Sequence, residues 1–144
     1  MSWRTLSEGG SRTVRISVHF TKVKLTSKHQ IWFLRHPGEK GFWDDRIVRH
    51  EFDHVRLSTL PNYSAQFAKN LRKNRYITRP VESGMQVNER FIRRLVDEHV
   101  KQEFEEVVDL VTIRYRELDR ETRHGISPLP DESGLKEWLR PGGS

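Results

Sequence analysis

Alternating apolar and polar residues near the start of the chain predict the first strand. The stretch is 12–25, and the apolar residues on one of its faces are Val14, Ile16, Val18 and Phe20. After Phe20 the apolar phase moves to Val23 and Leu25, which indicates a bulge or bend near residues 21–22. A second, shorter strand is expected at 31–34, where β-branched and aromatic residues precede a Pro-Gly break.

After this break, the apolar residues are spaced as on a helix. A helix is predicted from about residue 46 to 60, with Asp44 or Asp45 as its N-cap and Pro61 at its end. A further helical stretch follows, with apolar residues four positions apart: Tyr63, Phe67 and Leu71. Both segments are therefore expected to bury one apolar face.

Residues 87–123 contain neither Gly nor Pro and predict one long helix, or two nearly collinear ones. Its apolar residues at helical spacing are Phe91, Leu95, Phe104, Val107, Val111, Tyr115 and Leu118. A connector at 77–86 precedes it, Gly125 is placed to stop it, and a short amphipathic turn is expected around 135–139.

Strands followed by helices predict an α+β fold. In it, N-terminal antiparallel strands would pack on the 46–60 helix and on the long C-terminal helix. The expected organisation is a flexible N-terminal segment over 1–11, one domain over 12–126, and a C-terminal tail over 127–144.

Composition narrows the chemistry. Of 144 residues, 34% are hydrophobic and 32% charged, and cysteine is absent, which excludes disulfides, thiol nucleophiles and Cys-ligated metal sites. No apolar run approaches the roughly 18 residues of a membrane span. The net charge of +6 permits an acidic partner, but the charges are mixed in sign, so no specific nucleic-acid partner is expected. The polar start carries no signal pattern; the expected compartment is periplasmic or secreted if a signal peptide has been removed, otherwise cytoplasmic.

The segment His50-Glu51-Phe52-Asp53-His54 matches the pattern H-E-x-x-H. On a helix, His50 and His54 stack one turn apart, so their imidazoles can ligate one tetrahedral metal ion, usually zinc. Glu51, about 100° round the helix, can act as general base on a water at the metal. The competing interpretation is a solvated or core histidine pair. Asp53 is a candidate to orient His50, or a plain surface carboxylate.

A catalytic site of this kind needs a third protein ligand. The nearby G-x-x-H continuation fails because Leu57 and Leu60 stand at its positions, and no Asp or Glu occurs from 55 to 81. The ligand must therefore come from later in the chain. The candidates are His99, His124, Glu98, Glu103, Glu105, Glu106 and Asp109.

The segment Asp119-Arg120-Glu121-Thr122-Arg123-His124-Gly125 resembles the D-x-E-T-x-H-G signature of a bacterial family of predicted secreted zinc-dependent proteases, a domain family of unknown function. Its members carry an H-E-x-x-H helix earlier in the chain, as here, and the resemblance covers roughly residues 12–126. It implies a zincin-like fold with His50, His54 and His124 as zinc ligands and Glu51 as base. The family usually has an aromatic residue before the Asp, where this chain has Leu118.

Three further residues near the second motif are expected to support or border the site. His124 can turn inward only if the long helix ends near Thr122 and Gly125 reverses the chain; otherwise His124 caps the helix dipole. Glu121 either hydrogen-bonds His124 or is an exposed carboxylate. Tyr115 either polarises an oxyanion or, as its spacing favours, belongs to the core.

The leading functional prediction is a zinc-dependent metallopeptidase that hydrolyses a peptide or protein substrate with metal-activated water. The alternative is a catalytically inactive zincin-like module that binds an acidic partner. A nucleic-acid binder is supported by charge alone.

Overall fold

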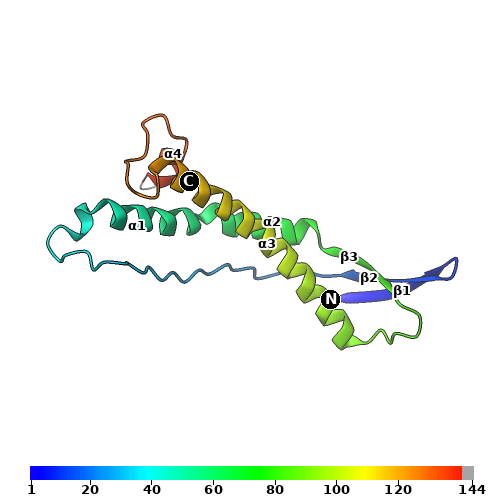
Figure 1. Cartoon of the computed structure of the whole chain (residues 1–144). Helices are drawn as coiled ribbons and strands as arrows, with labels where there is room; N and C mark the ends of the chain where they lie inside the picture. The colour runs from blue at the N-terminus through cyan, green and yellow to red at the C-terminus, as the bar shows by residue number, and fades with distance from the viewer. Residues whose placement is uncertain (141–144) are drawn as a thin grey trace. The chain divides into compact units, whose positions relative to one another are not determined.

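The computed structural model describes residues 1–140 and shows an α+β chain, with a three-stranded antiparallel sheet near the N-terminus and a long helix near the C-terminus (Figure 1). Its contacts group into two compact units. The first comprises Met1–Lys24 and Ala65–Glu106, and the second comprises Leu25–Ser64 and Val107–Ser144. The boundaries expected at residues 11 and 126 do not separate these units.

The sheet of the first unit has the order β1-β2-β3, with β1 at Ser2–Glu8, β2 at Ser11–Ser17 and β3 at Tyr76–Val81. The expectation of a flexible segment over 1–11 is wrong. Gly9 and Gly10 have φ values of 55° and 83°, and Glu8 pairs with Ser11, which gives a two-residue hairpin turn. Positive φ at both turn positions suits the twist of a hairpin and favours glycine. The backbone ladder therefore orders β1.

Strand β2 confirms the alternation predicted from residue 12, because Val14 and Ile16 are fully buried. The strand ends at Ser17, however, and within the described chain residues 18–41 carry no helix or strand, so the strand predicted at 31–34 is wrong. The third strand is β3, which overlaps the expected connector 77–86. Pro80 is tolerated there because β3 is an edge strand, where one missing backbone donor costs little.

The core of the first unit lies between the sheet and the N-terminal part of α3, which spans Glu89–Thr122. Its buried apolar members are Val14, Ile16, Val18, Ile77, Val81, Ile92 and Leu95. The Asn88 side chain accepts a hydrogen bond from the Phe91 N–H at 3.0 Å, which caps the start of α3. The long helix predicted over 87–123 is confirmed within two residues of each end.

The second unit is built on α1, Arg46–Ser58, which the short helix η1 at Phe42–Asp44 precedes. Asp45 is the N-cap of α1, because its Oδ1 accepts from the N–H groups of Ile47 and Val48 at 2.8 and 3.2 Å. The unit also holds the start of α2 (Pro61–Lys73), the end of α3 and the short helix α4 (Leu135–Leu139).

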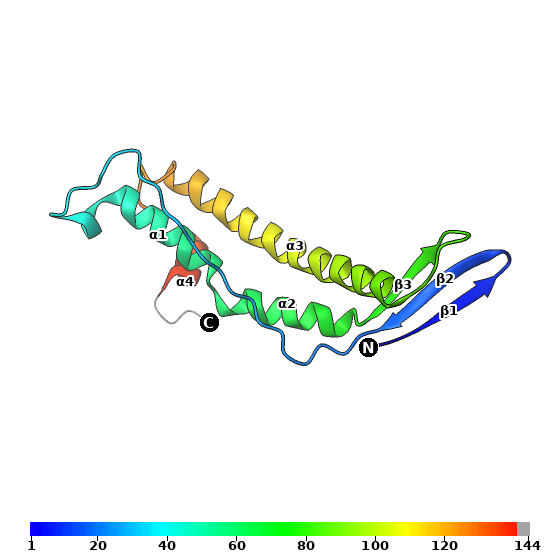
Figure 2. The same ribbon diagram turned by 90° about the horizontal axis from the view of Figure 1, so that it is seen from below.

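Helix α4 lies beside α1 (Figure 2). The core of the second unit is formed by three fully buried leucines, Leu57, Leu118 and Leu135. This packing fixes α1 against the end of α3. None of the helices in the described chain is long and apolar enough to cross a membrane.

Candidate metal centre

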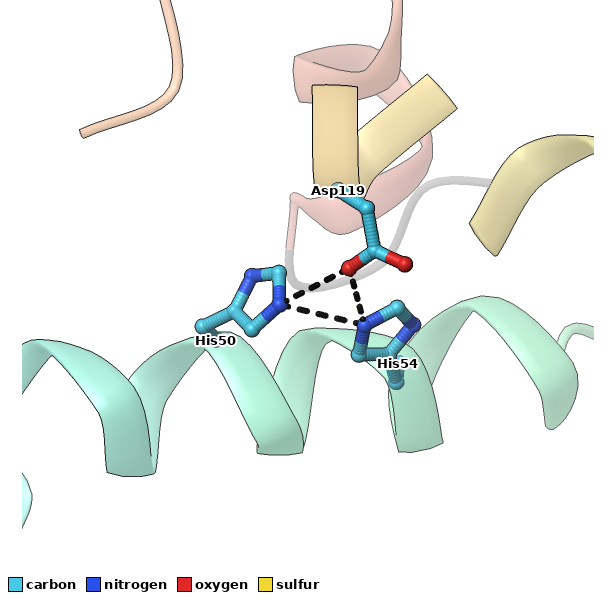
Figure 3. Close-up of side chains that lie close together, drawn as sticks. All are labelled: His50, His54 and Asp119. Carbon is cyan, nitrogen blue, oxygen red and sulfur yellow. Dashed lines mark hydrogen bonds and ion pairs between the residues drawn. The ribbon is translucent and has the colours of Figure 1, made fainter. Parts of the chain in front are cut away.

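Helix α1 presents His50 and His54 on one face, as the four-residue spacing predicts. Their Nε2 atoms lie 3.2 Å apart, and the ring planes meet at 78° (Figure 3). The side chain of His50 is 5% exposed and that of His54 15% exposed. Both rings therefore point away from bulk water toward the end of α3.

The third side chain at this point is Asp119 of α3, whose Oδ1 lies 3.0 Å from the Nε2 atom of each histidine (Figure 3). The three residues form a group able to hold a metal ion, with one donor atom from each within 4.8 Å of the others. Donor atoms about 2.0–2.1 Å from a tetrahedral zinc ion lie roughly 3.3 Å apart. The observed separations are close to that value.

A hydroxyl fixes the tautomer of His50. Thr122 Oγ1 donates to the Leu118 carbonyl at 2.7 Å and accepts from the Gly125 N–H at 3.1 Å. Its remaining lone pair faces His50 Nδ1 at 3.2 Å. The Leu118 carbonyl is closer to the hydroxyl than His50 Nδ1 is, so we assign the hydroxyl proton to that carbonyl and the donor role in this contact to His50 Nδ1. In the neutral ring, the lone pair of His50 therefore lies on Nε2, toward Asp119.

Burial makes the neutral form of His50 the favoured one. Desolvation is the largest cause that lowers the His50 pKa below its usual value, and the nearby His54 lowers it further, whereas the charge of Asp119 raises it. A neutral His50 directs a lone pair at a carboxylate oxygen 3.0 Å away. His54 can donate one proton to Asp119, but the contact between His50 and Asp119 stays a contact between two acceptors. A cation at this point would satisfy all three groups.

No family model, curated protein or solved structure matches this chain.

The third member of the group is Asp119, whereas the motif resemblance implies His124 as the third ligand. Helix α3 does end at Thr122, and Arg123, His124 and Gly125 then adopt φ values of 51°, 55° and 80°. This left-handed turn brings His124 Nδ1 to 3.7 Å from Asp119 Oδ1, yet the His124 side chain is 82% exposed. His124 therefore borders the group from the solvent side.

Gly125 allows the close approach between this turn and α1. A Cβ atom added at Gly125 would lie 2.9 Å from His50 Cβ and 3.0 Å from His50 Cγ. Such distances are shorter than any normal carbon–carbon contact, and the positive φ independently favours glycine. The Gly in the second motif is thus needed for the position of the first histidine.

The expected supporting residues divide into one that contacts the group and two that do not. The Tyr115 ring packs edge-on against His54, with ring centroids 4.5 Å apart, and also borders the leucine core. Asp53 accepts from Arg56 at 2.9 Å rather than from His50, and burial raises its pKa. Glu121 Oε2 is buried without a hydrogen-bond partner in the described chain, so that oxygen fits neither alternative, the bond to His124 or the exposed carboxylate. The reversal at 123–125 directs His124 toward Asp119 instead.

Glu51 lines a hollow of about 600 Å³ together with Ile47 and Val48 of α1 and the segment 32–38. Its negative charge raises the pKa of His50, which places the carboxylate within electrostatic reach of the group. A smaller hollow of about 310 Å³ is lined by His50, Arg46 and Arg49. On α1, these arginines project to the opposite side of His50 from Glu51.

The sequence analysis missed Asp119 and Thr122 as parts of the site, although both lie in the quoted motif. Tyr115, Asp119 and Thr122 are spaced at i, i+4 and i+7, which places them on one helix face. On that face, Tyr115 contacts His54 and Asp119 contacts both histidines. Thr122 contacts His50. The sequence signal that could have identified Asp119 and Thr122 is their position on the same helix face as Tyr115.

Proposed function

We propose that this chain is a zinc-dependent peptidase of the H-E-x-x-H type. The observation that carries the proposal is the His50–His54–Asp119 group, in which a hydroxyl fixes one imidazole with its lone pair directed at a carboxylate. Two imidazoles and one carboxylate form a donor set used by hydrolytic zinc and also by other divalent metals. The adjacent Glu51 and the resemblance to secreted zinc-dependent proteases favour zinc and hydrolysis.

Each residue of the site would have a separate role in peptide hydrolysis. A zinc ion held by His50, His54 and Asp119 would supply a Lewis acid that lowers the pKa of a water molecule and polarises a substrate carbonyl. Glu51 would take up the proton of the attacking water when the water oxygen bonds to the carbonyl carbon. Glu51 then passes the proton to the amine nitrogen as the carbon–nitrogen bond breaks. Thr122 keeps the His50 lone pair directed at the ion.

The test compares two carboxylate-to-amide variants. Glu51→Gln should retain about one zinc per chain, measured by elemental analysis, because Glu51 is no ligand in this group. The same variant should cleave a quenched-fluorescent peptide library at least about 100-fold more slowly than the wild type, since it loses the general base. Glu105→Gln alters an exposed carboxylate near Lys101 and should leave cleavage unchanged.

Two results would contradict the proposal. Retained cleavage in Glu51→Gln would show that another group is the base. Zinc-loaded wild-type protein that cleaves no member of the library would instead favour the alternative, a zinc-containing binding module.

A further inference from the structure

Exposed apolar side chains gather at the hollow that Glu51 lines. Trp32 is 83% exposed, Leu34 107% and Ile47 42%, and all three line this hollow. Isolated exposed apolar residues are ordinary on protein surfaces, but a cluster around one concavity marks a binding site. The volume of about 600 Å³ is within the range of ligand pockets, roughly 300–1,000 Å³.

Aromatic contacts tie the two walls of this hollow together. Phe33, beside Trp32 and Leu34, packs edge-on against Phe42 at 6.2 Å between ring centroids. Phe42 in turn contacts Trp43, and Trp43 contacts Phe52 of α1, each at 4.9 Å. The segment 32–38 is therefore linked through edge-on and tilted ring contacts to the helix that carries the histidines, which gives the hollow a defined shape.

The direction of the hollow follows from the helix period. At about 100° per residue, His54, Ile47 and Glu51 project roughly 40°, 60° and 100° from His50, all in the same sense. Ile47 and Glu51 line the hollow, so it opens on the Glu51 side of α1, and Glu51 is the residue that connects it to the candidate centre. A peptide whose scissile bond lies beside Glu51 would place a neighbouring side chain within reach of Trp32, Leu34 and Ile47, which line the same hollow.

We infer that this hollow binds an aromatic or large aliphatic side chain of the peptide substrate, next to the bond that is cleaved. The inference rests on the proposed peptidase function for its substrate, and it adds the substrate class. Two features identify the occupant. The walls of the hollow are apolar, and the proposed general base, Glu51, lines the same hollow. Aromatic and branched aliphatic side chains would bury their surface against Trp32 and Leu34.

The test uses zinc-loaded protein and two peptides that differ at one central position, Phe against Ser. The Phe peptide should be cleaved with a kcat/KM about 10-fold or more above that of the Ser peptide, and should bind the Glu51→Gln variant more tightly by fluorescence anisotropy. The double variant Trp32→Ala/Leu34→Ser should lose this preference while keeping its zinc content. Trp3→Ala removes an exposed tryptophan on β1 and should keep the preference.

Each contrary outcome has a separate meaning. Equal cleavage of both peptides overturns the apolar site and leaves the peptidase intact. Binding of the Phe peptide that depends on Trp32, without any cleavage, supports the site and overturns the peptidase. A dimer that becomes monomeric in Trp32→Ala/Leu34→Ser would assign the hollow to a second copy of this chain, which also overturns the inference.

Discussion

At the scale of single residues, the candidate centre depends on which atoms carry protons. Thr122 has one proton and two lone pairs, and the Leu118 carbonyl and the Gly125 N–H use one of each. With the remaining lone pair facing His50, the ring is assigned as a donor from Nδ1, which leaves the Nε2 lone pair toward Asp119. A half-buried carboxylate opposite an imidazole lone pair is unfavourable without a cation, so the same hydrogen bonds that order His50 also define where a metal ion would bind.

Replacing Asp119 and replacing His124 should have very different effects on zinc affinity. Asp119→Ala should weaken zinc binding by more than about 100-fold, because it removes a ligand from between two imidazoles. His124→Ala should change it by less than about 3-fold, since this side chain is 82% exposed and 3.7 Å from Asp119. Competition with a fluorescent chelator measures both. The reverse ranking would restore the ligand set that the motif resemblance implies.

Thr122 offers a test of the tautomer argument. Thr122→Val keeps the shape of the side chain but removes the hydroxyl that holds His50 Nδ1. Zinc affinity should fall by about 10–100-fold, as for the loss of other groups that orient a ligand. Thr112→Val is the matched control, because its hydroxyl also donates to a carbonyl four residues earlier, Val108 at 2.9 Å, away from the histidines. An equal effect of both variants would refute the specific role of Thr122.

At the scale of elements, the sequence predicted those helices and strands whose formation depends on residues close together in the chain. Periodicity and capping located α1, α2 and α3, since a helix buries a face that its own sequence defines. The hairpin of β1 and β2 was missed although Gly9-Gly10 is a local signal for a two-residue turn. Strand β3 was missed because Pro80 indicated a connector, and only the edge position of the strand makes that proline acceptable.

The turn after α3 joins two elements of the site, and its glycine can be tested. Gly125→Ala should lower the free energy of unfolding by about 2 kcal/mol or more, because the added Cβ meets His50 at 2.9 Å and the φ of 80° is unfavourable for alanine. Zinc affinity should fall as well, since His50 must move. Urea denaturation and zinc titration measure the two effects.

Gly134→Ala provides the control for this glycine. An added Cβ at Gly134 meets no heavy atom within 4 Å, and its φ is −62°, which any residue adopts. Its effect on the free energy of unfolding should stay within about 0.5 kcal/mol. If both alanine variants behave alike, the close approach of the turn to His50 does not constrain the centre.

At the scale of the whole molecule, the limit of sequence-based prediction is the pairing of distant segments. His50 and Asp119 are 69 residues apart, and a hydrophobic pattern tells which face of each helix is buried but not which partner covers it. The spacing of His50 and His54 could therefore be predicted, whereas the third member of the group, Asp119, was not among the candidate ligands. The structure selects it because the leucine core of the second unit holds α1 against the end of α3.

Binding at this centre should stabilise the folded chain, because its donors come from two helices that separate when the protein unfolds. Zinc at about 100 times its dissociation constant should add about 2.7 kcal/mol to the free energy of unfolding. For a chain of this size, that corresponds to a rise of the melting temperature by roughly 5–15 °C. Calorimetry with zinc and then with excess chelator measures the gain and its reversal. Asp119→Ala should show little or no gain at the same zinc concentration, and magnesium should not replace zinc, because imidazole ligands suit zinc better. An equal gain in the Asp119→Ala variant would place the bound ion elsewhere in the chain.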